Sequence, residues 1–355
     1  MSNIPTKTFY GSTKKEYMYL LEKKRKRLKQ EEEFKERPLP NIKSYDTCFS
    51  ERKVWKQFYR QQEALEYCKS VRERAACLFA VEKSDGKRGY LVTTRKQFWE
   101  KYQTLNEKRR HFYEVIPENT PCRLYFDIEF KHQFNQTLDG GEVLITFIAF
   151  VCHCIYQEFQ IRCDENNVIN LMSSTEQKFS RHLIFHHPDL LFEDNIQCGE
   201  FVKEICFSLR SFLMTGLHNK YLPMNGTNLE ISTNDLNNIM IYNEKNEKMF
   251  LCDLCVYTKN RNFRIFKSSK VSKNVPLIIS DDNKFKFKSK PDGREKYLKY
   301  QMRNEKFDAH LEMFCDTLVC PANEFNTPEK VLKFGSTTCK NQSPGTVFCF
   351  LVYIY

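Results

Sequence analysis

Between Cys122 and Phe130 apolar and polar residues alternate, and this pattern constrains the fold more than any other feature of the sequence. The even-numbered positions carry the large apolar side chains Leu124, Phe126, Ile128 and Phe130. The odd-numbered positions carry Arg123, Tyr125, Asp127 and Glu129. Because successive side chains of a β-strand point to opposite faces, the pattern predicts a strand with one buried apolar face and one polar face.

The polar face of this strand brings two carboxylates together. Asp127 and Glu129 are two residues apart, a separation of about 6.6 Å along a strand. Two carboxylates at that spacing can grip one divalent ion, or two ions roughly 3.5 to 4 Å apart. An ordinary edge strand with a solvated polar face also explains so short a motif, and the strand alone leaves this alternative open.

A third acid, Asp253, stands alone in the apolar stretch Met249–Tyr257. We expect this stretch to form a strand, and an unpaired buried carboxylate there is costly. Asp253 therefore needs a partner, which is either a metal ion or a nearby arginine. Two acids on one strand and one on another are the usual ligand set for metal-assisted phosphoryl chemistry, so Asp127, Glu129 and Asp253 are candidate catalytic metal ligands.

The segment Ser173–Phe185 carries hydrogen-bond donors for an anion. As a strand leaving a turn, it would present an ammonium, a hydroxyl and an imidazole on one face, from Lys178, Ser180 and His182. These three groups suit a triphosphate, while Phe179 and Arg181 fall on the other face. The plainer alternative is a core histidine with satisfied hydrogen bonds.

A second basic segment, Lys259–Lys270, packs five cations around two phenylalanines. Arg261 and Arg264 are three residues apart, so a regular strand would place them on opposite faces. A turn or bulge near Asn262 would let both converge on one ligand. Basic residues interleaved with aromatic ones suit a nucleotide or a single strand. A solvated edge strand protected by its charges is the alternative.

Composition limits how this chain could bind phosphate. Only 11 of the 355 residues are glycine, and neither GxGxxG nor GxxxxGK[ST] occurs, which argues against Rossmann and P-loop phosphate binding. The formal net charge of +11 favours phosphate-bearing partners. Part of that charge is a pentad near the N-terminus, which is a solvated face, an arm on a phosphate backbone or a nuclear import signal. The pentad consists of Lys23, Lys24, Arg25, Lys26 and Arg27.

The cysteines and the apolar runs bear on the compartment. Fifteen cysteines, an odd number, follow no apolar signal peptide, which indicates reduced thiols in an intracellular protein. The longest apolar run, Val143–Tyr156, is shorter than the roughly 20 residues that cross a bilayer. We therefore expect a buried core helix and no membrane contact.

The order of predicted elements indicates an α+β fold with mixed sheets flanked by helices. Helices are expected at residues 52–71, 98–102, 141–159 and 193–213. Strands are expected at 77–81, 89–94, 122–130, 239–242 and 249–267, and a pair of strands at 168–185. We divide the chain into a basic N-terminal helix and linker, an N-terminal α/β module, a catalytic module with a surface loop near 215–238, and a divergent tail. Their bounds are 1–40, 41–118, 119–320 and 321–355.

The three motifs, in this order, resemble the archaeo-eukaryotic primase superfamily, and most closely its eukaryotic primase-polymerase family. Tyr90–Thr94 and Tyr113–Asn119 add to the likeness, which runs from about Trp55 to Asp316. The resemblance implies a two-module catalytic core with an N-terminal helix. It also implies a DNA polymerase and primase that uses two Mn²⁺ or Mg²⁺ ions, a DNA template-primer and dNTPs, with NTPs left open.

The resemblance also implies roles for individual residues. Asp127, Glu129 and Asp253 match the family's catalytic metal ligands. The residues that match its nucleotide-binding positions are Arg88, Lys178, Phe179, Ser180, Arg181, His182, Arg261, Asn262, Phe263, Arg264 and Lys270. The basic helix that carries Lys23–Arg27 matches, with less similarity, a helix that grips template DNA.

The chain departs from the family pattern after Asp316, where neither the zinc knuckle nor the acidic tail that binds single-strand-binding protein follows. We therefore expect primer elongation to survive, de novo priming to be weak and contact with single-strand-binding protein to be lost. Cys252-x-x-Cys255 would place its thiols on opposite strand faces, and Cys152-His153-Cys154 lies on an expected helix, so no zinc is expected.

The family also implies a monomer in the nucleus and mitochondrion. There it would serve replication fork restart and damage tolerance, by translesion synthesis or repriming. Two alternatives from other classes remain: a two-metal nuclease and a non-catalytic protein that binds single-stranded nucleic acid.

Overall fold

The computed structural model describes residues 22, 54–71, 75–215, 220–227, 229–271, 273–287, 309–321 and 331–334. The chain separates into two compact units, Met1–Arg52 and Lys53–Tyr355. The sheets and the pocket belong to the second unit. The predicted DNA-binding pentad Lys23–Arg27 lies outside the described residues.

The first sheet has five antiparallel strands in the order β1-β3-β2-β4-β12. Their bounds are β1 Trp55–Phe58, β2 Ala76–Glu82, β3 Arg88–Thr94, β4 Phe112–Ile116 and β12 Arg261–Arg264. Two helices, α2 (Gln61–Ser70) and α3 (Arg95–Thr104), connect its strands. Because β12 comes from far along the chain, this sheet crosses the module boundary that we predicted at residue 118. The basic segment is thereby fixed to the edge of the N-terminal sheet.

The prediction of one helix over residues 52–71 is wrong at its start. Trp55–Phe58 is strand β1, paired with β3 in the register Trp55↔Thr93, and the helix begins at Gln61. Aromatic residues fit a pleated surface well, and here pairing with β3 outweighs the helical pattern of the residues that follow.

The second sheet has four strands in the order β13-β6-β7-β5. Their bounds are β5 Tyr125–Lys131, β6 Val168–Met172, β7 Lys178–Phe185 and β13 Ile278–Ile279. In the β5–β7 ladder Asp127 lies opposite His182, and Glu129 lies opposite Ser180. Opposite residues of a ladder share a face, so the two acids and the Lys-x-Ser-x-His set project to the same side of this sheet.

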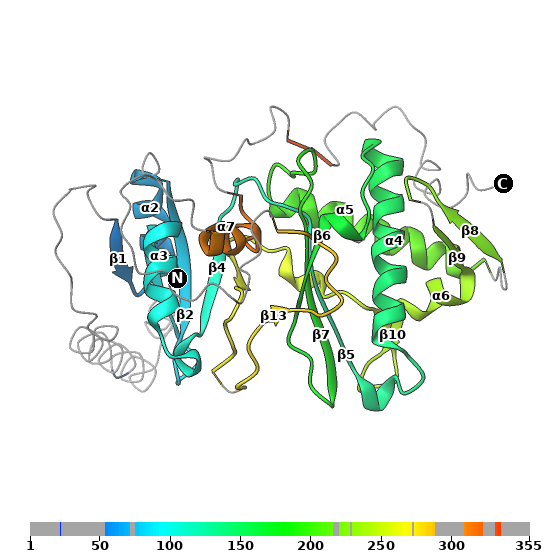
Figure 1. Cartoon of the computed structure of the whole chain (residues 1–355), viewed down its shortest axis with the longest axis horizontal. Coiled ribbons are helices and arrows are strands. Elements are labelled where there is room, and N and C mark those ends of the chain that lie inside the picture. Colours follow the sequence, from blue (N-terminus) through cyan, green and yellow to red (C-terminus); the bar gives the residue numbers. More distant parts are fainter. Residues whose placement is uncertain are drawn as a thin grey trace, which may run out of the picture. The chain divides into compact units, whose positions relative to one another are not determined.

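The apolar face of β5 is covered by helices, as the alternation predicted. Figure 1 shows α4 (Gly140–Phe159) and α5 (Asn195–Leu213) beside the second sheet. Phe126 of β5 meets Phe147 of α4 edge to face, with ring centroids 5.0 Å apart. By length and composition α4 could cross a membrane, but 67% of that stretch is buried inside the protein. It packs as a core helix.

The stretch near residues 215–238 is not the surface loop that we predicted. It contains a hairpin of β8 (Tyr221–Met224) and β9 (Leu229–Ser232), followed by α6 (Thr233–Asn238). Leu222 and Ile231 are buried, so the hairpin contributes to the core. The strands are only four residues long and their flanks are rich in asparagine, which hid the alternation.

Shorter elements complete the described part of the chain. They are β10 Met240–Tyr242, β11 Lys248–Phe250, and the 3-10 helices η3 Glu107–Arg109, η4 His132–Phe134, η5 Glu165–Asn167 and η6 Leu254–Val256. Strands β10 and β11 form a separate hairpin. The predicted strand over residues 249–267 is therefore two strands with η6 between them.

Helix α7 (Ala309–Asp316) lies between the first sheet and the second (Figure 1). The ring of Phe314 stacks on Trp99 of α3, with centroids 4.7 Å apart. Just after the helix, the buried carboxylate of Glu114 on β4 accepts the backbone N–H of Val319 at 2.7 Å. The observed fold is α+β, as the sequence predicted. All pairs of named strands are antiparallel, whereas mixed sheets were expected.

Candidate active site

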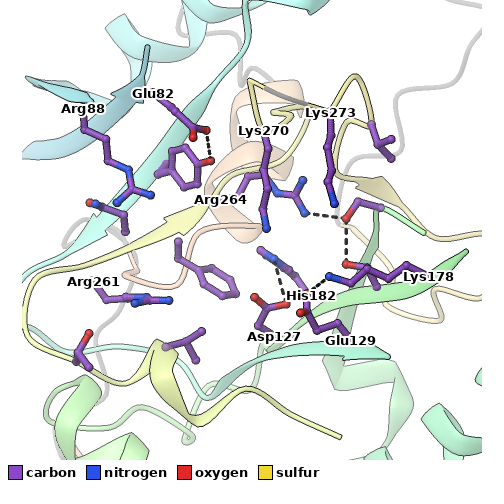
Figure 2. A pocket seen from close by; sticks show the side chains of 18 of the residues that line it. Glu82, Arg88, Asp127, Glu129, Lys178, His182, Arg261, Arg264, Lys270 and Lys273 are labelled. Atoms are coloured by element: carbon purple, nitrogen blue, oxygen red, sulfur yellow. Dashed lines mark hydrogen bonds and ion pairs between the residues drawn. The ribbon is translucent and has the colours of Figure 1, made fainter. Parts of the chain in front are cut away.

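A pocket of about 810 Å³ is lined by residues of both sheets and holds most of the predicted site residues. Figure 2 shows its side chains converging from β3 and β12 on one side and from β5 and β7 on the other. The predicted residues that line it are Arg88, Asp127, Glu129, Lys178, Ser180, His182, Arg261, Asn262, Phe263, Arg264 and Lys270. Motifs separated by more than a hundred residues thus meet in one cavity.

Asp127 and Glu129 form what we call the acidic wall of the pocket, on the polar face of β5. The Glu129 carboxylate accepts a charged hydrogen bond from the Lys178 ammonium, and His182 Nε2 lies 3.7 Å from Asp127 Oδ1. Burial, together with the neighbouring charge of Glu129, raises the pKa of the Asp127 carboxyl to about 6. A cation that enters the pocket would stabilise the ionised form of this carboxyl group and so lower its pKa.

The donor set of the acidic wall fits a divalent cation. Mg²⁺ in particular is usually held by one or two carboxylates together with substrate phosphates and waters, and does not need a closed protein cage. In the part of the chain that the structure describes, no group of three or more His, Cys, Asp or Glu side chains is arranged to hold a metal. Asp127 and Glu129 therefore suit an ion whose remaining coordination positions are filled by a phosphate-bearing substrate and waters.

Asp253 is not in a strand, which corrects its predicted placement. It follows an isolated bridge between Ile128 and Cys252, and its backbone N–H donates to the Asp127 carbonyl at 2.8 Å. Its carboxylate accepts the N–H of Cys255 at 2.8 Å and caps η6. The apolar stretch looked like one strand, but the chain turns here. The backbone hydrogen bond to Asp127 thus places Asp253 beside the acidic wall. The role of its carboxylate as a metal ligand stays a prediction.

We call Arg261, Arg264 and Lys270 the basic wall. Arg264 is 9% exposed, and burial lowers its pKa while the charge of Asp127 opposes that shift. Lys270 points toward His182 and Asp127 (Figure 2). Burial, with the Arg264 and Lys270 charges, holds the pKa of His182 well below its ordinary value. The imidazole is therefore neutral at pH 7.

Arg261 and Arg264 both reach the pocket although they are three residues apart. We predicted a turn or bulge near Asn262, but Asn262 lies within β12, opposite Val115. The turn comes two residues earlier, at Asn260, where φ is +53°. Asparagine tolerates this left-handed conformation better than most residues. β12 is an edge strand with only β4 beside it, so side chains from both of its faces can reach past its free edge. Their convergence thus comes from the edge position, since the turn at Asn260 precedes both residues of the regular strand.

Phe179 and Arg181, two predicted nucleotide-binding residues, do not line the pocket. They lie on the other face of β7, where Phe179 stacks on Phe130 with centroids 4.9 Å apart. The Arg181 guanidinium lies 4.3 Å over the Phe179 ring and donates to Ser174 Oγ. These two residues pack against the face of β7 that points away from the pocket.

Several pocket residues escaped the sequence analysis, namely Gln61, Glu82, Tyr90, Tyr113, Ser173, Thr175 and Lys273. Tyr113 donates to the Glu82 carboxylate at 2.6 Å, and the Arg88 guanidinium lies 5.0 Å from the Tyr113 ring centroid. Tyr113 stood in a stretch that contributed to the family resemblance, but no residue pattern marked its chemistry. Only the fold brings these residues to the cavity.

The cysteines considered for zinc have other surroundings. Cys252 is buried with its Sγ 4.0 Å from that of Cys206, while Cys255 is exposed. His153 is buried in α4, and its Nδ1 accepts the backbone N–H of Asn225 at 2.8 Å. The expectation of a zinc-free chain stays a prediction.

Comparison with known proteins places this chain in a family. No protein-family model matches the chain. The DNA-directed primase/polymerase protein of Homo sapiens is 36% identical over 274 residues, which cover 65% of this chain and 49% of that protein. The protein of the same name from Bos taurus is 36% identical over 311 residues, 74% of this chain and 55% of that protein. The chain belongs to the DNA-directed primase/polymerase family.

The Danio rerio primase/polymerase gives a similar result, with 37% identity over 244 residues that cover 65% of this chain and 46% of that protein. The chain spans about half the length of the curated relatives it matches. The resemblance drawn from three short motifs is thus confirmed at the level of the family.

Proposed function

We propose that this chain catalyses template-directed nucleotidyl transfer, joining dNTPs to the 3′-hydroxyl of a primer. Its membership of the primase/polymerase family supports this proposal. The observation that carries it is the pocket itself, in which an acidic wall and a basic wall line one cavity. Such a cavity can hold a triphosphate between fixed cations and a pair of metal-binding carboxylates.

The chain's own residues would bind and orient the nucleotide. Arg264 and Lys270 would neutralise the β and γ phosphates from the first-sheet side, and Lys178 would do so from β7. Arg261 extends the cationic lining toward Arg88. Preorganised charges of this kind stabilise phosphoryl transfer without a protein nucleophile. His182, held neutral, would donate or accept one hydrogen bond and add no charge.

Asp127 and Glu129 would hold the divalent cations, Mn²⁺ or Mg²⁺. When bound, such cations lower the pKa of an attacking hydroxyl and offset the charge of the leaving pyrophosphate. Lys178 and His182 lie against the two carboxylates. These side chains keep the acidic wall assembled.

We extend the proposal to the biological setting on the strength of the family alone. The chain would act in the nucleus and mitochondrion on primed DNA, in replication fork restart and damage tolerance by translesion synthesis or repriming.

A primed template with a labelled primer, incubated with Mn²⁺ with and without dNTPs, tests the function. Longer primers that require dNTPs support the proposal, whereas shortening without dNTPs would indicate a nuclease. An unchanged primer with salt-dependent binding would indicate a binding protein. The folded variant Asp127→Ala/Glu129→Ala should extend no primer, and the control Asp189→Ala/Glu200→Ala, which removes two exposed acids outside the pocket, should behave like the wild type.

A further inference from the structure

The hydroxyl of Ser173 lies between the two sheets at the pocket. It follows β6 of the second sheet and accepts a hydrogen bond at 2.7 Å from Nη2 of Arg264, which comes from β12 of the first sheet. Figure 2 shows this bond as the dashed line from Arg264. Ser173 Oγ also lies 3.1 Å from Ser180 Oγ on β7. One hydroxyl therefore connects the basic wall to the polar face of β7.

The protons in this chain of contacts can be counted. A guanidinium has donors only, so Arg264 must donate to Ser173. Ser173 keeps a single proton of its own, and either serine could donate between Ser173 and Ser180. An ionised phosphate oxygen accepts hydrogen bonds and cannot donate. If Ser180 binds such an oxygen, it must use its own proton, and Ser173 must then donate to Ser180.

We propose that Ser173 is a positioning residue that aligns a directed chain of donors, from Arg264 through Ser173 and Ser180 to a phosphate oxygen of the nucleotide. This inference rests on the proposed function, because it assumes that the pocket takes a triphosphate. Hydrogen bonds in a chain polarise one another, and this chain starts at a cation. The Ser180 hydroxyl thereby becomes a stronger donor toward the phosphate.

The backbone of the turn holds Ser173 in place for this role. Its N–H donates to the Ser180 carbonyl at 3.1 Å. The neighbouring Ser174 accepts the Ser180 N–H at 2.9 Å and donates back to the Ser180 carbonyl at 3.2 Å. Ser173 and Ser180 are thus locked side by side, and the orientation of the two hydroxyl protons is the freedom that remains.

Binding of inorganic tripolyphosphate to the full chain, measured by calorimetry with Mg²⁺, tests the donor chain. We expect Ser173→Ala and Ser180→Ala each to weaken binding about tenfold, the typical cost of one hydrogen bond to a charged group. Because both act through the same donor, the double variant should bind no more than about threefold more weakly than Ser180→Ala. Independent effects that multiply to about a hundredfold loss would overturn the proposal.

Two further variants separate positioning from folding. Ser173→Thr keeps the hydroxyl and should restore most of the affinity that Ser173→Ala loses. Ser70→Ala removes a comparable hydrogen bond, to the Tyr67 carbonyl on exposed α2, and should leave binding unchanged. Thermal unfolding of each variant identifies any loss that comes from folding. A folded Ser173→Ala that binds like the wild type contradicts the proposal.

Primer extension by the same proteins distinguishes this proposal from the proposed function. We expect Ser173→Ala to raise the KM for dNTP about tenfold while affinity for primed DNA stays constant. A wild type that binds tripolyphosphate, shows the coupling and extends no primer would refute the polymerase function alone. A wild type that extends primers while Ser173→Ala keeps its dNTP KM would refute the role of Ser173 alone. A wild type that neither binds tripolyphosphate nor extends primers would refute both.

Discussion

The acidic wall and the basic wall of the pocket are held in different ways. Asp127 and Glu129 belong to the regular β5–β7 ladder, and a covered apolar face lies behind them. The basic wall belongs to an edge strand and the loop after it, joined to the second sheet through contacts such as Arg264 with Ser173 and Phe263 with His182. A position in a ladder tolerates a change in charge, whereas a position held by a few side chains depends on each of them.

Asp127→Asn should have the largest effect on activity and little on stability. The substitution removes a proposed ligand for the cation, and we expect primer extension to fall about 10³-fold, at the upper end for loss of one preorganised group. It also removes a buried charge beside Glu129, so the free energy of unfolding of the metal-free protein should not decrease. Steady-state extension and urea unfolding measure the two quantities. A destabilised Asp127→Asn would show that the acidic wall needs its charge to fold.

Arg264→Ala should act on the other wall, mainly through nucleotide binding. It removes the proposed charged donor to the triphosphate and the observed bond to Ser173, so the KM for dNTP should rise about 10- to 100-fold. Arg264→Lys keeps the charge but loses the planar guanidinium, so its KM for dNTP should lie between those of the wild type and Arg264→Ala. Primer extension over a range of dNTP concentrations measures this effect. If only kcat falls, the basic wall does not bind the ground-state nucleotide.

Asn260→Ala should have a smaller effect that tests the turn before the basic wall. Alanine is strained at φ +53°, so we expect a loss of about 1 kcal/mol in the free energy of unfolding. Displacement of Arg261 should raise the KM for dNTP severalfold. Asn260→Gly is the matched control, because glycine takes this conformation freely. Equal stability of the alanine and glycine variants would exclude a constraint at this turn.

The smallest effect is expected at Glu158 and Glu204, which lie in α4 and α5, outside both walls. Burial raises the pKa of both carboxyls, and the charge of Glu204 adds to the shift at Glu158. A raised pKa means that the folded chain binds more protons, so stability should fall as pH rises above about 4.5. Urea unfolding at pH 4.5 and 7 measures this loss of stability. Glu204→Gln should reduce the difference in the free energy of unfolding between the two pH values by about 0.5 kcal/mol, after allowance for solvent screening. A steeper loss of stability with pH in Glu204→Gln would show that folding does not raise the pKa of Glu204.

The two walls also differed in how far the sequence could predict them. The alternation in Cys122–Phe130 fixes which side chains share a face, so the acidic wall and its partners on β7 could be predicted from local pattern. The pairing of β12 with β4 joins residues about 150 apart, and no local pattern encodes it. The 3-10 turn after Asp253 is likewise set by contacts with β5.

Pocket residues such as Glu82 and Ser173 could not be found for the same reason. Each is a common polar residue whose role depends on a partner that is remote in sequence, Tyr113 for one and Arg264 for the other. By contrast, the Lys-x-Ser-x-His set carries its chemistry in its own spacing. A motif is visible in a sequence when its residues share one element, and it is hidden when the elements must first assemble.

The order in which the first sheet receives its strands has a consequence for synthesis on the ribosome. Four of its strands emerge early, but β4 remains without its outer neighbour until residues 261–264 have been translated. Glu114 on the same strand waits longer, until Val319 has left the exit tunnel to meet its carboxylate. The first sheet is therefore completed late in synthesis, and the outer edge of β4 stays unpaired while about 150 further residues are added.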